Sequence, residues 1–150
     1  MAEKYNLKEM LSYMRPEGSS AQTRFCNRYL KPVFGTPDIF GNYTKIIGDK
    51  PDIAFMAHHD TVHKFSGKQV VTDENGHYTV KGAISNCLGA DCTTGVYIIL
   101  KMIEAKVPGV YVVHAAEEVG CIGSAGVVAG NPDWIKHVRF AISFDRMGYS

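Results

Sequence analysis

The sequence has few cysteines, no paired cysteine motif and no long hydrophobic run. It contains four cysteines in 150 residues, and none of them forms a C-x-x-C pair, which argues against a zinc knuckle. No apolar stretch approaches the ~20 residues that a membrane-spanning helix needs, and the first residues, "MAEKYNLKEMLSYMRPEG", lack the apolar core of a secretory signal. We therefore expect a cytoplasmic protein with no membrane partner and with reduced, mostly buried thiols.

The chain also lacks a strong excess of charge. Its formal net charge is +1, and its lysines and arginines are scattered, so we expect no nucleic-acid partner. No glycine-rich loop follows a first strand in the form that nucleotide-binding domains require. The sequence has no internal repeat and no low-complexity linker, and its hydrophobic residues, 45% of the total, suffice for one core. We expect a single domain over residues 1–150.

Apolar residues at helical spacing predict four helices. The predicted helices cover residues 5–14, 19–34, 91–107 and 123–137. Pro32 and Gly35 are expected to close the second helix. The fourth helix is built of small residues and includes a loop.

Short apolar runs bounded by turn residues predict the strands. Three of these runs are continuous, as in strands covered on both faces: residues 53–57, 109–116 and 138–148. Further strands are expected within residues 38–50, with a turn near Gly41-Asn42, and a hairpin is expected within residues 69–82. Because continuous strands alternate with helices, we predict an α/β fold, a three-layer α/β/α arrangement around a mixed, mainly parallel sheet.

Charged and imidazole side chains follow each of the three continuous strands. These residues are His58-His59-Asp60 after the first strand, Glu117-Glu118 after the second and Asp145 in the third, and Asp91 stands at the start of a helix. In open α/β sheets the ligand crevice lies beyond the carboxyl ends of the strands. We therefore expect these side chains to converge at one edge of the sheet.

Carboxylates crowded in one cleft repel one another and take up protons, and a divalent cation removes that conflict. A mixture of histidine and carboxylate ligands suits zinc, and also manganese or cobalt. A carboxylate that bridges two cations would hold them ~3.5–4 Å apart, the arrangement used for hydrolysis. The pattern therefore predicts a site for up to two zinc ions.

The order of these motifs resembles that of the co-catalytic di-zinc peptidases, which include peptidase T, carboxypeptidase G, and the leucyl and tetrahedral aminopeptidases. The matching segments are "HHD" at 58–60, "GADCTTG" at 89–95, "EEVGCIGS" at 117–124 and "FD" at 144–145. The segment "RPEGSS" is similar to an early segment of that family. The resemblance covers nearly the whole chain and implies a zinc-peptidase-like catalytic domain.

The resemblance implies a role for each metal ligand. His58 and Asp145 would bind the first metal, Asp91 would bridge the two metals, and Glu118 would bind the second. A mononuclear site of His58, Asp91 and Asp145 is the alternative.

The resemblance also implies two catalytic residues. Glu117 would be the general base that takes a proton from the attacking water and passes it to the leaving amine. Asp60 would not bind the metal itself but would orient the side chain of His58, which does. The family often has a cis peptide after the bridging aspartate, here Asp91-Cys92.

The chain departs from the family pattern in two places. Cys92 stands where the family usually has Asp, Asn or Glu, so its thiol could become an adventitious ligand or an oxidation site. The family's last metal-binding histidine lies far downstream, and full-length relatives are about twice as long as this chain. We expect the chain to correspond to the N-terminal half of the family's domain. A truncated chain, a protein completed by another chain and a minimal variant all remain open.

The other histidines have separate expected roles. His59 should point away from the side of the strand that carries His58. His63 is a candidate for a substrate contact or a substitute ligand. His114 is expected to be a hydrogen-bonded core residue, and His77 and His137 are expected to lie on the surface.

The resemblance implies metal-dependent hydrolysis of peptide bonds, with an exopeptidase acting on a small peptide as the expected type. Two alternatives stay open: a metal-binding remnant that serves as a binding or assembly module, and an N-acyl amino-acid amidohydrolase. An exposed apolar sheet edge is expected if the second half is absent, which makes a homo-oligomer or a complementing chain a possible partner.

Overall fold

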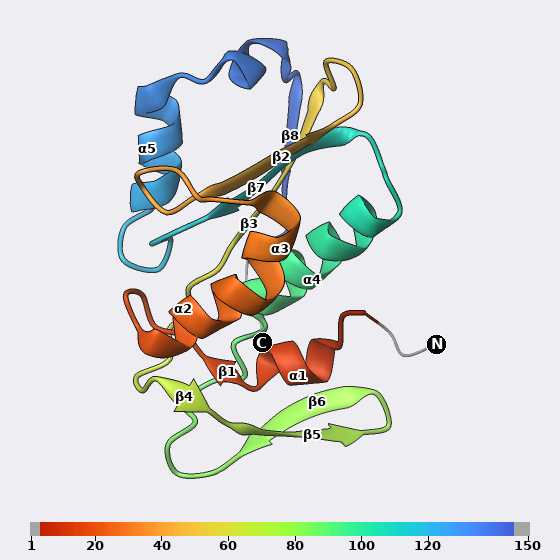
Figure 1. Ribbon diagram of the computed structural model, residues 1–150. Coiled ribbons are helices and arrows are strands. Elements are labelled where there is room, and N and C mark those ends of the chain that lie inside the picture. The colour runs from red at the N-terminus through yellow and green to blue at the C-terminus, as the bar shows by residue number, and fades with distance from the viewer. Residues whose placement is uncertain (1–3, 146–150) are drawn as a thin grey trace.

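A mixed four-stranded sheet forms the centre of the molecule (Figure 1), in a computed structural model that describes residues 4–145. Its strands, in spatial order, are β2 (Tyr43–Ile47), β7 (Gly109–His114), β3 (Ile53–His58) and β8 (Phe140–Ser143). The β3 strand runs parallel to both β7 and β8, and only β2 runs antiparallel to its neighbour β7. The predicted mixed, mainly parallel sheet is confirmed.

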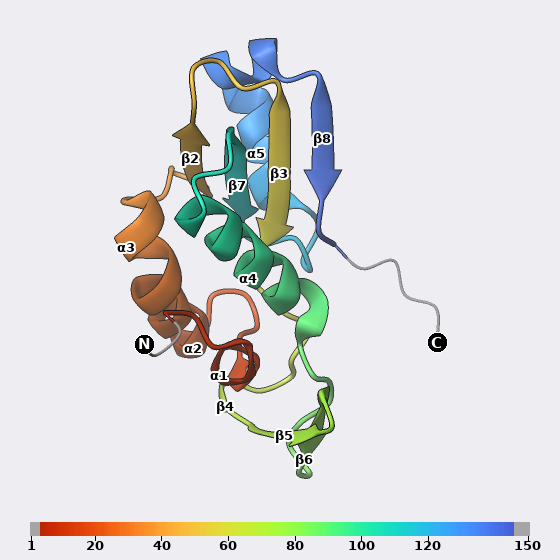
Figure 2. The same cartoon turned by 90° about the vertical axis from the view of Figure 1, so that its right-hand side faces the viewer.

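Helices cover both faces of the sheet, as the three-layer prediction requires (Figure 2). One face carries α1 (Leu7–Leu11), α2 (Ser20–Phe25), α3 (Lys31–Phe34) and α4 (Ala90–Glu104). The other face carries α5 (Ile122–Gly130) and a short 3-10 helix, η2 (Asp133–His137).

The central strand β7 explains why the sequence shows continuous apolar runs. Every residue of β7 is buried. Tyr111 and Val113 point into the larger core with the four helices, whereas Val110 and Val112 join a smaller core with Trp134. Alternate residues of a strand face opposite sides of the sheet, so a strand covered on both sides needs apolar residues throughout.

The N-terminal helix is shorter than predicted. The α1 helix starts at Leu7, where the Asn6 side chain accepts a hydrogen bond from the Glu9 backbone N–H, and it ends before Ser12. The next residues form the two-residue strand β1 (Tyr13–Met14), which pairs with β4 (Gly67–Lys68). The prediction of helix through Met14 is wrong because this strand pairing outweighs the local helical periodicity.

The second predicted helix is continuous in position but changes its geometry. A π-helical turn, η1 (Cys26–Leu30), separates α2 from α3. Pro32 was expected to end the helix but lies in the first turn of α3, where a missing backbone N–H breaks no hydrogen bond. Gly35, with a φ of 86°, follows the last helical residue as predicted.

The strand predictions were right for most of the sheet and wrong at two places. Only β2 forms within residues 38–50, because the Asp38 carboxylate accepts hydrogen bonds from the backbone N–H groups of Phe40 and Asn42 and holds a turn there. The third apolar strand, β8, was expected to be buried, but it is an exposed edge strand. The predicted residues 146–148 of that strand lie outside the described part of the chain.

The predicted hairpin is confirmed. Strands β5 (Val70–Glu74) and β6 (His77–Lys81) pair in antiparallel register across Asn75 and Gly76. These two residues have φ values of 56° and 85°, the left-handed backbone that a tight two-residue hairpin turn requires. Across residues 4–145, no helix is both long enough and apolar enough to cross a membrane.

Gly123, at the start of α5, is expected to tolerate no side chain. A Cβ atom there would overlap the Asn42 side chain and lie 2.8 Å from the backbone nitrogen of Ala115. We expect Gly123→Ala to lower the free energy of unfolding by about 1–3 kcal/mol, the usual cost of overpacking. Denaturant unfolding measures this change.

Gly130, at the other end of the same helix, provides the matched control. No atom lies within 4 Å of a Cβ placed there, and alanine favours the helix by up to about 1 kcal/mol. Gly130→Ala should therefore leave the stability unchanged or raise it. Equal losses in the two variants would contradict the assignment of a specific close contact at Gly123.

Candidate metal centre

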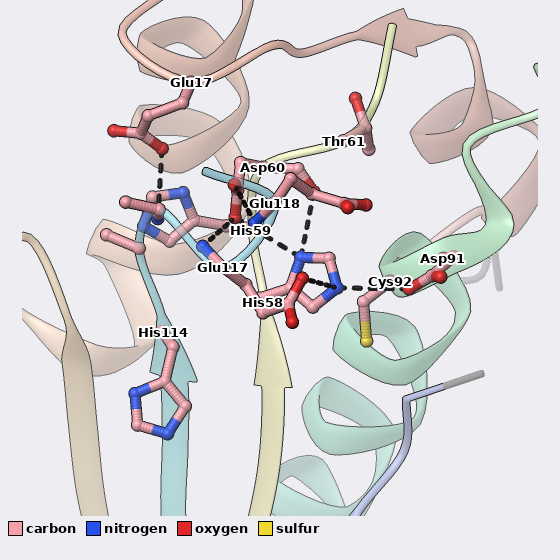
Figure 3. A network of polar contacts seen from close by, with 12 residues as sticks. Glu17, His58, His59, Asp60, Thr61, Asp91, Cys92, His114, Glu117 and Glu118 are labelled. Atoms are coloured by element: carbon pink, nitrogen blue, oxygen red, sulfur yellow. Dashed lines mark hydrogen bonds and ion pairs between the residues drawn. The ribbon is translucent and has the colours of Figure 1, made fainter. Parts of the chain in front are cut away.

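The predicted site residues do converge at the carboxyl edge of the parallel strands. His58 is the last residue of β3, Glu117 and Glu118 follow β7, Asp145 follows β8, and Asp91 lies in the first turn of α4. Figure 3 shows His58 near the centre of this group, with Asp91 and the two glutamates around it. The sequence therefore located this cluster correctly, although segments far apart in the chain supply it.

His58 presents one ring nitrogen to the cluster. Its Nε2 atom lies 3.1 Å from an Asp91 carboxylate oxygen and 3.7 Å from oxygens of both Glu117 and Asp145. Only 3% of the side chain is exposed. The other nitrogen, Nδ1, lies 3.1 Å from the backbone oxygen of Asp60 and 3.3 Å from its carboxylate. With Nδ1–H donating to Asp60, Nε2 faces the carboxylates: it donates to them while the ring is protonated, and it could bind a cation once that proton is lost.

Asp60 connects the His58 strand to the two glutamates. Its carboxylate is fully buried and accepts hydrogen bonds from the backbone N–H groups of Glu117 (3.1 Å) and Glu118 (2.9 Å). Burial alone would raise the pKa of Asp60, but the contact with His58 and these two hydrogen bonds outweigh it and lower the pKa. An ionised Asp60 thus fixes both the His58 ring and the loop after β7.

The possible ligand atoms form two groups that share His58. The first group contains His58, Asp91, Cys92 and Asp145, and the second contains His58, Glu117 and Glu118; the ligand atoms of each group lie within 4.8 Å of one another. The first group contains all three residues expected for the first metal. Glu118 is grouped with His58 and Glu117 rather than with Asp91, its expected partner at the second metal.

The electrostatics of the cluster show an excess of negative charge. Burial lowers the pKa of His58, but the hydrogen bond and charge of Asp60 and the charge of Glu117 outweigh it and raise the pKa to about 9. Burial raises the pKa of Glu118 to about 7. Burial and the neighbouring Asp145 also raise the pKa of Asp91. The site therefore holds protons where a cation would satisfy the same carboxylates.

A buried oxygen of Glu118 supports the fit of a cation. This atom, Oε1, is shielded from solvent and has no hydrogen-bond partner in the part of the chain that the structure describes. Buried carboxylate oxygens are normally hydrogen-bonded or bound to a cation. One imidazole and several carboxylates make a donor set that suits zinc, and also manganese or cobalt. The residues present therefore fit a divalent metal ion.

The backbone at Asp91 matches the expected pattern. The Asp91-Cys92 peptide bond is cis. Gly89, just before α4, has a left-handed φ of 71°, and the Thr93 hydroxyl donates a hydrogen bond to its carbonyl oxygen. The expected cis peptide after the proposed bridging aspartate is confirmed.

Three buried histidines, His59, His63 and His114, lie outside both groups of possible ligands. His59 points away from His58, as predicted, and its ring nitrogens contact the Gln22 side chain and the Gly41 carbonyl. His114 is a buried histidine in contact with the Asn42 side chain, also as predicted.

His63 is engaged elsewhere. Its Nδ1 atom lies 2.7 Å from the Thr61 hydroxyl and its Nε2 atom 3.1 Å from the Cys87 carbonyl oxygen. Both ring nitrogens thus have partners inside the protein, and the side chain is buried. The structure gives His63 a role in holding the loop before α4. The two remaining histidines, His77 and His137, lie on the surface as predicted.

Two charged residues near the site were not identified from the sequence. The Glu17 carboxylate accepts a hydrogen bond from the Ala116 backbone N–H at 3.1 Å and thereby holds the loop that carries Glu117. Arg15 is fully buried and donates from Nε to the His59 carbonyl oxygen at 2.9 Å. Both belong to the segment "RPEGSS", whose proline and glycine indicate an exposed turn, so only the family resemblance pointed to it.

Two solved peptidase structures are similar to this chain in fold. A tripeptidase from Staphylococcus aureus has a TM-score of 0.68 and 19% sequence identity, and the match covers 95% of this chain and 42% of that one. Aminopeptidase PepT from Bacillus cereus has a TM-score of 0.60 and 16% identity, with 97% of this chain and 45% of that one covered. The chain thus spans less than half the length of these structures.

Sequence comparison gives the family directly. No curated protein is significantly similar to this chain in sequence. Residues 42–150, which include every proposed metal ligand, match the family described as Peptidase family M28. The fold, the clustered ligand atoms and this match agree, and the chain belongs to peptidase family M28.

Proposed function

We propose that this chain forms the metal-holding part of a catalytic domain that hydrolyses peptide bonds. The observation that carries the proposal is the convergence of His58, Asp91, Asp145 and the two adjacent glutamates at one edge of the sheet. The buried Glu118 oxygen, which has no hydrogen-bond partner among residues 4–145, and the family membership support it. Residues 1–150 would correspond to the N-terminal half of a longer domain.

The proposed first metal would be held by His58, Asp91 and Asp145. A second would be held by Glu118, with Asp91 as the bridging carboxylate. Zinc bound at such a site polarises the scissile carbonyl and lowers the pKa of water, which supplies a nucleophile near neutral pH.

The side chains around the metal would position and move protons. Asp60 would hold the His58 ring so that Nε2 faces the ligand cluster. Glu117 would act as the general base, because its carboxylate lies beside His58 yet remains partly exposed, at 32% of the side chain. It would take a proton from the attacking water and deliver it to the leaving amine.

A small peptide with a free end is the proposed substrate. The structurally similar proteins are a tripeptidase and an aminopeptidase, and we extend that exopeptidase class to this chain as part of the proposal. Contacts from outside residues 1–150 would complete the substrate pocket, since this chain spans less than half the length of the similar peptidase structures. N-acyl amino acids are the competing substrate class.

Metal counting together with hydrolysis assays tests this function. Protein loaded with zinc is compared with a Glu118→Ala variant by elemental analysis, and both are assayed on tripeptides, aminoacyl amides and N-acyl amino acids, with and without chelator. Two ions in the parent, fewer in the variant and chelator-sensitive tripeptide cleavage are expected. One ion that the variant retains, without hydrolysis of any substrate, would favour a metal-binding module. Cleavage confined to N-acyl amino acids would favour the amidohydrolase.

Zinc affinity should rise with pH. Zinc must displace the proton that His58 holds in the metal-free protein, because the pKa of His58 is about 9, and it competes with protonation of Glu118, whose pKa is about 7. Between pH 7 and 8 we expect binding to become at least about tenfold tighter per pH unit, the effect of one released proton, and steeper for each further ligand that loses a proton. Calorimetric titration in buffers of different ionisation enthalpy counts that proton. An affinity independent of pH would contradict the assignment of His58 as a ligand.

A further inference from the structure

The thiol of Cys92 lies among the proposed ligands of the first metal. Its Sγ atom is within 4.8 Å of the ligand atoms of His58, Asp91 and Asp145, and the side chain is fully buried. Figure 3 shows it beside Asp91 at the start of α4, next to the His58 ring. The thiol donates a hydrogen bond to the Phe144 carbonyl oxygen at 3.5 Å, and the backbone of His58 is a second hydrogen-bond partner.

The space around the sulfur depends on a glycine one helical turn further along α4. A Cβ atom at Gly95 would overlap the Cys92 sulfur and lie 2.9 Å from the Phe144 carbonyl oxygen. The missing side chain therefore lets the Cys92 sulfur and the segment that leads to Asp145 approach the same point of the helix. This close approach brings Cys92 and Asp145 into one ligand group.

The separations within the group are close to those of a four-coordinate metal. Zinc bonds of about 2.0–2.1 Å to nitrogen or oxygen and about 2.3 Å to sulfur place neighbouring tetrahedral ligand atoms roughly 3.3–3.6 Å apart. The contacts from His58 Nε2 to Asp91 (3.1 Å) and to Asp145 (3.7 Å) lie within about 0.2 Å of this range. The sulfur lies no more than 4.8 Å from each of the other ligand atoms, so each of these distances must shorten by at most about 1.2 Å to reach the upper end of this range.

We propose that Cys92 Sγ is a direct ligand of the first metal and completes a nitrogen, two-oxygen and sulfur set with His58, Asp91 and Asp145. This inference rests on the metal centre of the proposed function. When the metal binds, the thiol proton passes to solvent and the thiolate forms the metal–sulfur bond. A thiolate ligand favours zinc, cobalt and cadmium over manganese and magnesium.

Cobalt binding tests this assignment through a signal other than activity. Co²⁺ is added to the metal-free protein, and its visible bands report bound metal, whereas a near-ultraviolet charge-transfer band reports a cobalt–thiolate bond. We expect both in the parent protein. In Cys92→Ser the charge-transfer band should vanish, and the cobalt affinity should fall by at least about tenfold, the lower end of the cost seen when groups around a metal are replaced.

Two other cysteines serve as matched controls. Cys121 is exposed, and its thiol donates a hydrogen bond to a Glu117 carboxylate oxygen at 3.6 Å, so it is another thiol near the site. Cys26 is buried in the larger core, so Cys26→Ser measures the general cost of replacing a buried thiol. Both Cys121→Ser and Cys26→Ser should keep the charge-transfer band.

The failure of this inference differs from the failure of the proposed function. Visible cobalt bands without a charge-transfer band in the parent would overturn Cys92 as a ligand and leave the metal centre standing. No bound cobalt at all would overturn both. If Cys92→Ser does not fold, X-ray absorption spectroscopy of the zinc-loaded parent shows whether a sulfur atom is bound to the zinc. A sulfur neighbour at about 2.3 Å is expected, and a shell of only nitrogen and oxygen at about 2.0–2.1 Å would overturn the assignment.

Discussion

Replacing Glu117 by glutamine is expected to lower kcat for peptide hydrolysis by about 10²–10⁴-fold, the usual contribution of a general base, while the zinc content stays unchanged. Glutamine keeps the size of the side chain but cannot take a proton. The charge of Glu117 is one of the causes that raise the pKa of Glu118, so its removal favours ionised Glu118 and helps to retain the metal. Steady-state kinetics combined with elemental analysis of the same samples measures both quantities.

The neighbouring Cys121→Ser variant is the control for Glu117→Gln. It removes the thiol that donates a hydrogen bond to the Glu117 carboxylate but leaves the carboxylate in place. The kcat should therefore remain close to that of the parent. If Glu117→Gln loses zinc together with activity, Glu117 is a ligand and the proposed division of roles between the two glutamates is wrong.

Replacing Asp60 by alanine is expected to lower the free energy of unfolding by about 3–5 kcal/mol, the cost of removing one partner from a buried charged pair. The carboxylate is fully buried and contacts His58. It also accepts hydrogen bonds from the backbone N–H groups of Glu117 and Glu118. No water can easily replace it, so these donors would remain unpaired. Denaturant unfolding of the metal-free protein measures the loss.

Asp38 allows a matched comparison with Asp60. Its carboxylate also accepts hydrogen bonds from two backbone N–H groups, those of Phe40 and Asn42, but the residue is exposed. Water can take its place, so Asp38→Ala should cost only about 0.5–1.5 kcal/mol. Comparable losses in the two variants would mean that burial of Asp60 is not the source of its effect.

A further variant separates the positioning role of Asp60 from its structural role. Asp60→Asn keeps the shape of the side chain and can still accept one of the two backbone hydrogen bonds. It should lower zinc affinity by about 10–100-fold, as losses of residues that orient a metal ligand do, even at temperatures where the variant is fully folded. Unchanged affinity would show that Asp60 serves the fold alone.

The central sheet was predictable because burial on both faces requires a simple pattern. Residues 109–113 contain no charged side chain, and every residue of β7 is buried, since helices cover both of its sides. The β8 strand shows the limit of this argument. Phe140 and Ile142 have the same apolar character, yet they are exposed at the sheet edge. Composition indicates what a strand can bury and does not specify what covers it.

Local helical signals failed where distant segments compete for the same residues. Met14 follows a helical repeat, but its backbone pairs with Gly67, more than fifty positions away. That pairing cannot be deduced from the residues next to Met14. The failure at Pro32 is local instead: proline suits the first turn of a helix as well as a helix end, and α3 begins directly before it.

The candidate site was predictable to the extent that strand ends meet at one edge of a parallel sheet. This geometric rule predicted that these side chains cluster, without any knowledge of side-chain contacts. It could not identify Glu17, which reaches the site from a turn before α2 and holds the backbone of Ala116. It also could not predict that Glu118 groups with His58 and Glu117, and not with Asp91, because that choice depends on side-chain rotamers.

The spread of the proposed ligands along the chain determines when their cluster can form during folding. His58 must meet Asp91, then residues after β7, and finally Asp145, and each contact closes a longer loop than the one before. The parallel pairing of β3 with β7 and β8 has the same long-range character, which makes folding slow. We expect the ligand cluster to assemble only in the last stage of folding, so zinc should slow unfolding far more than it accelerates refolding.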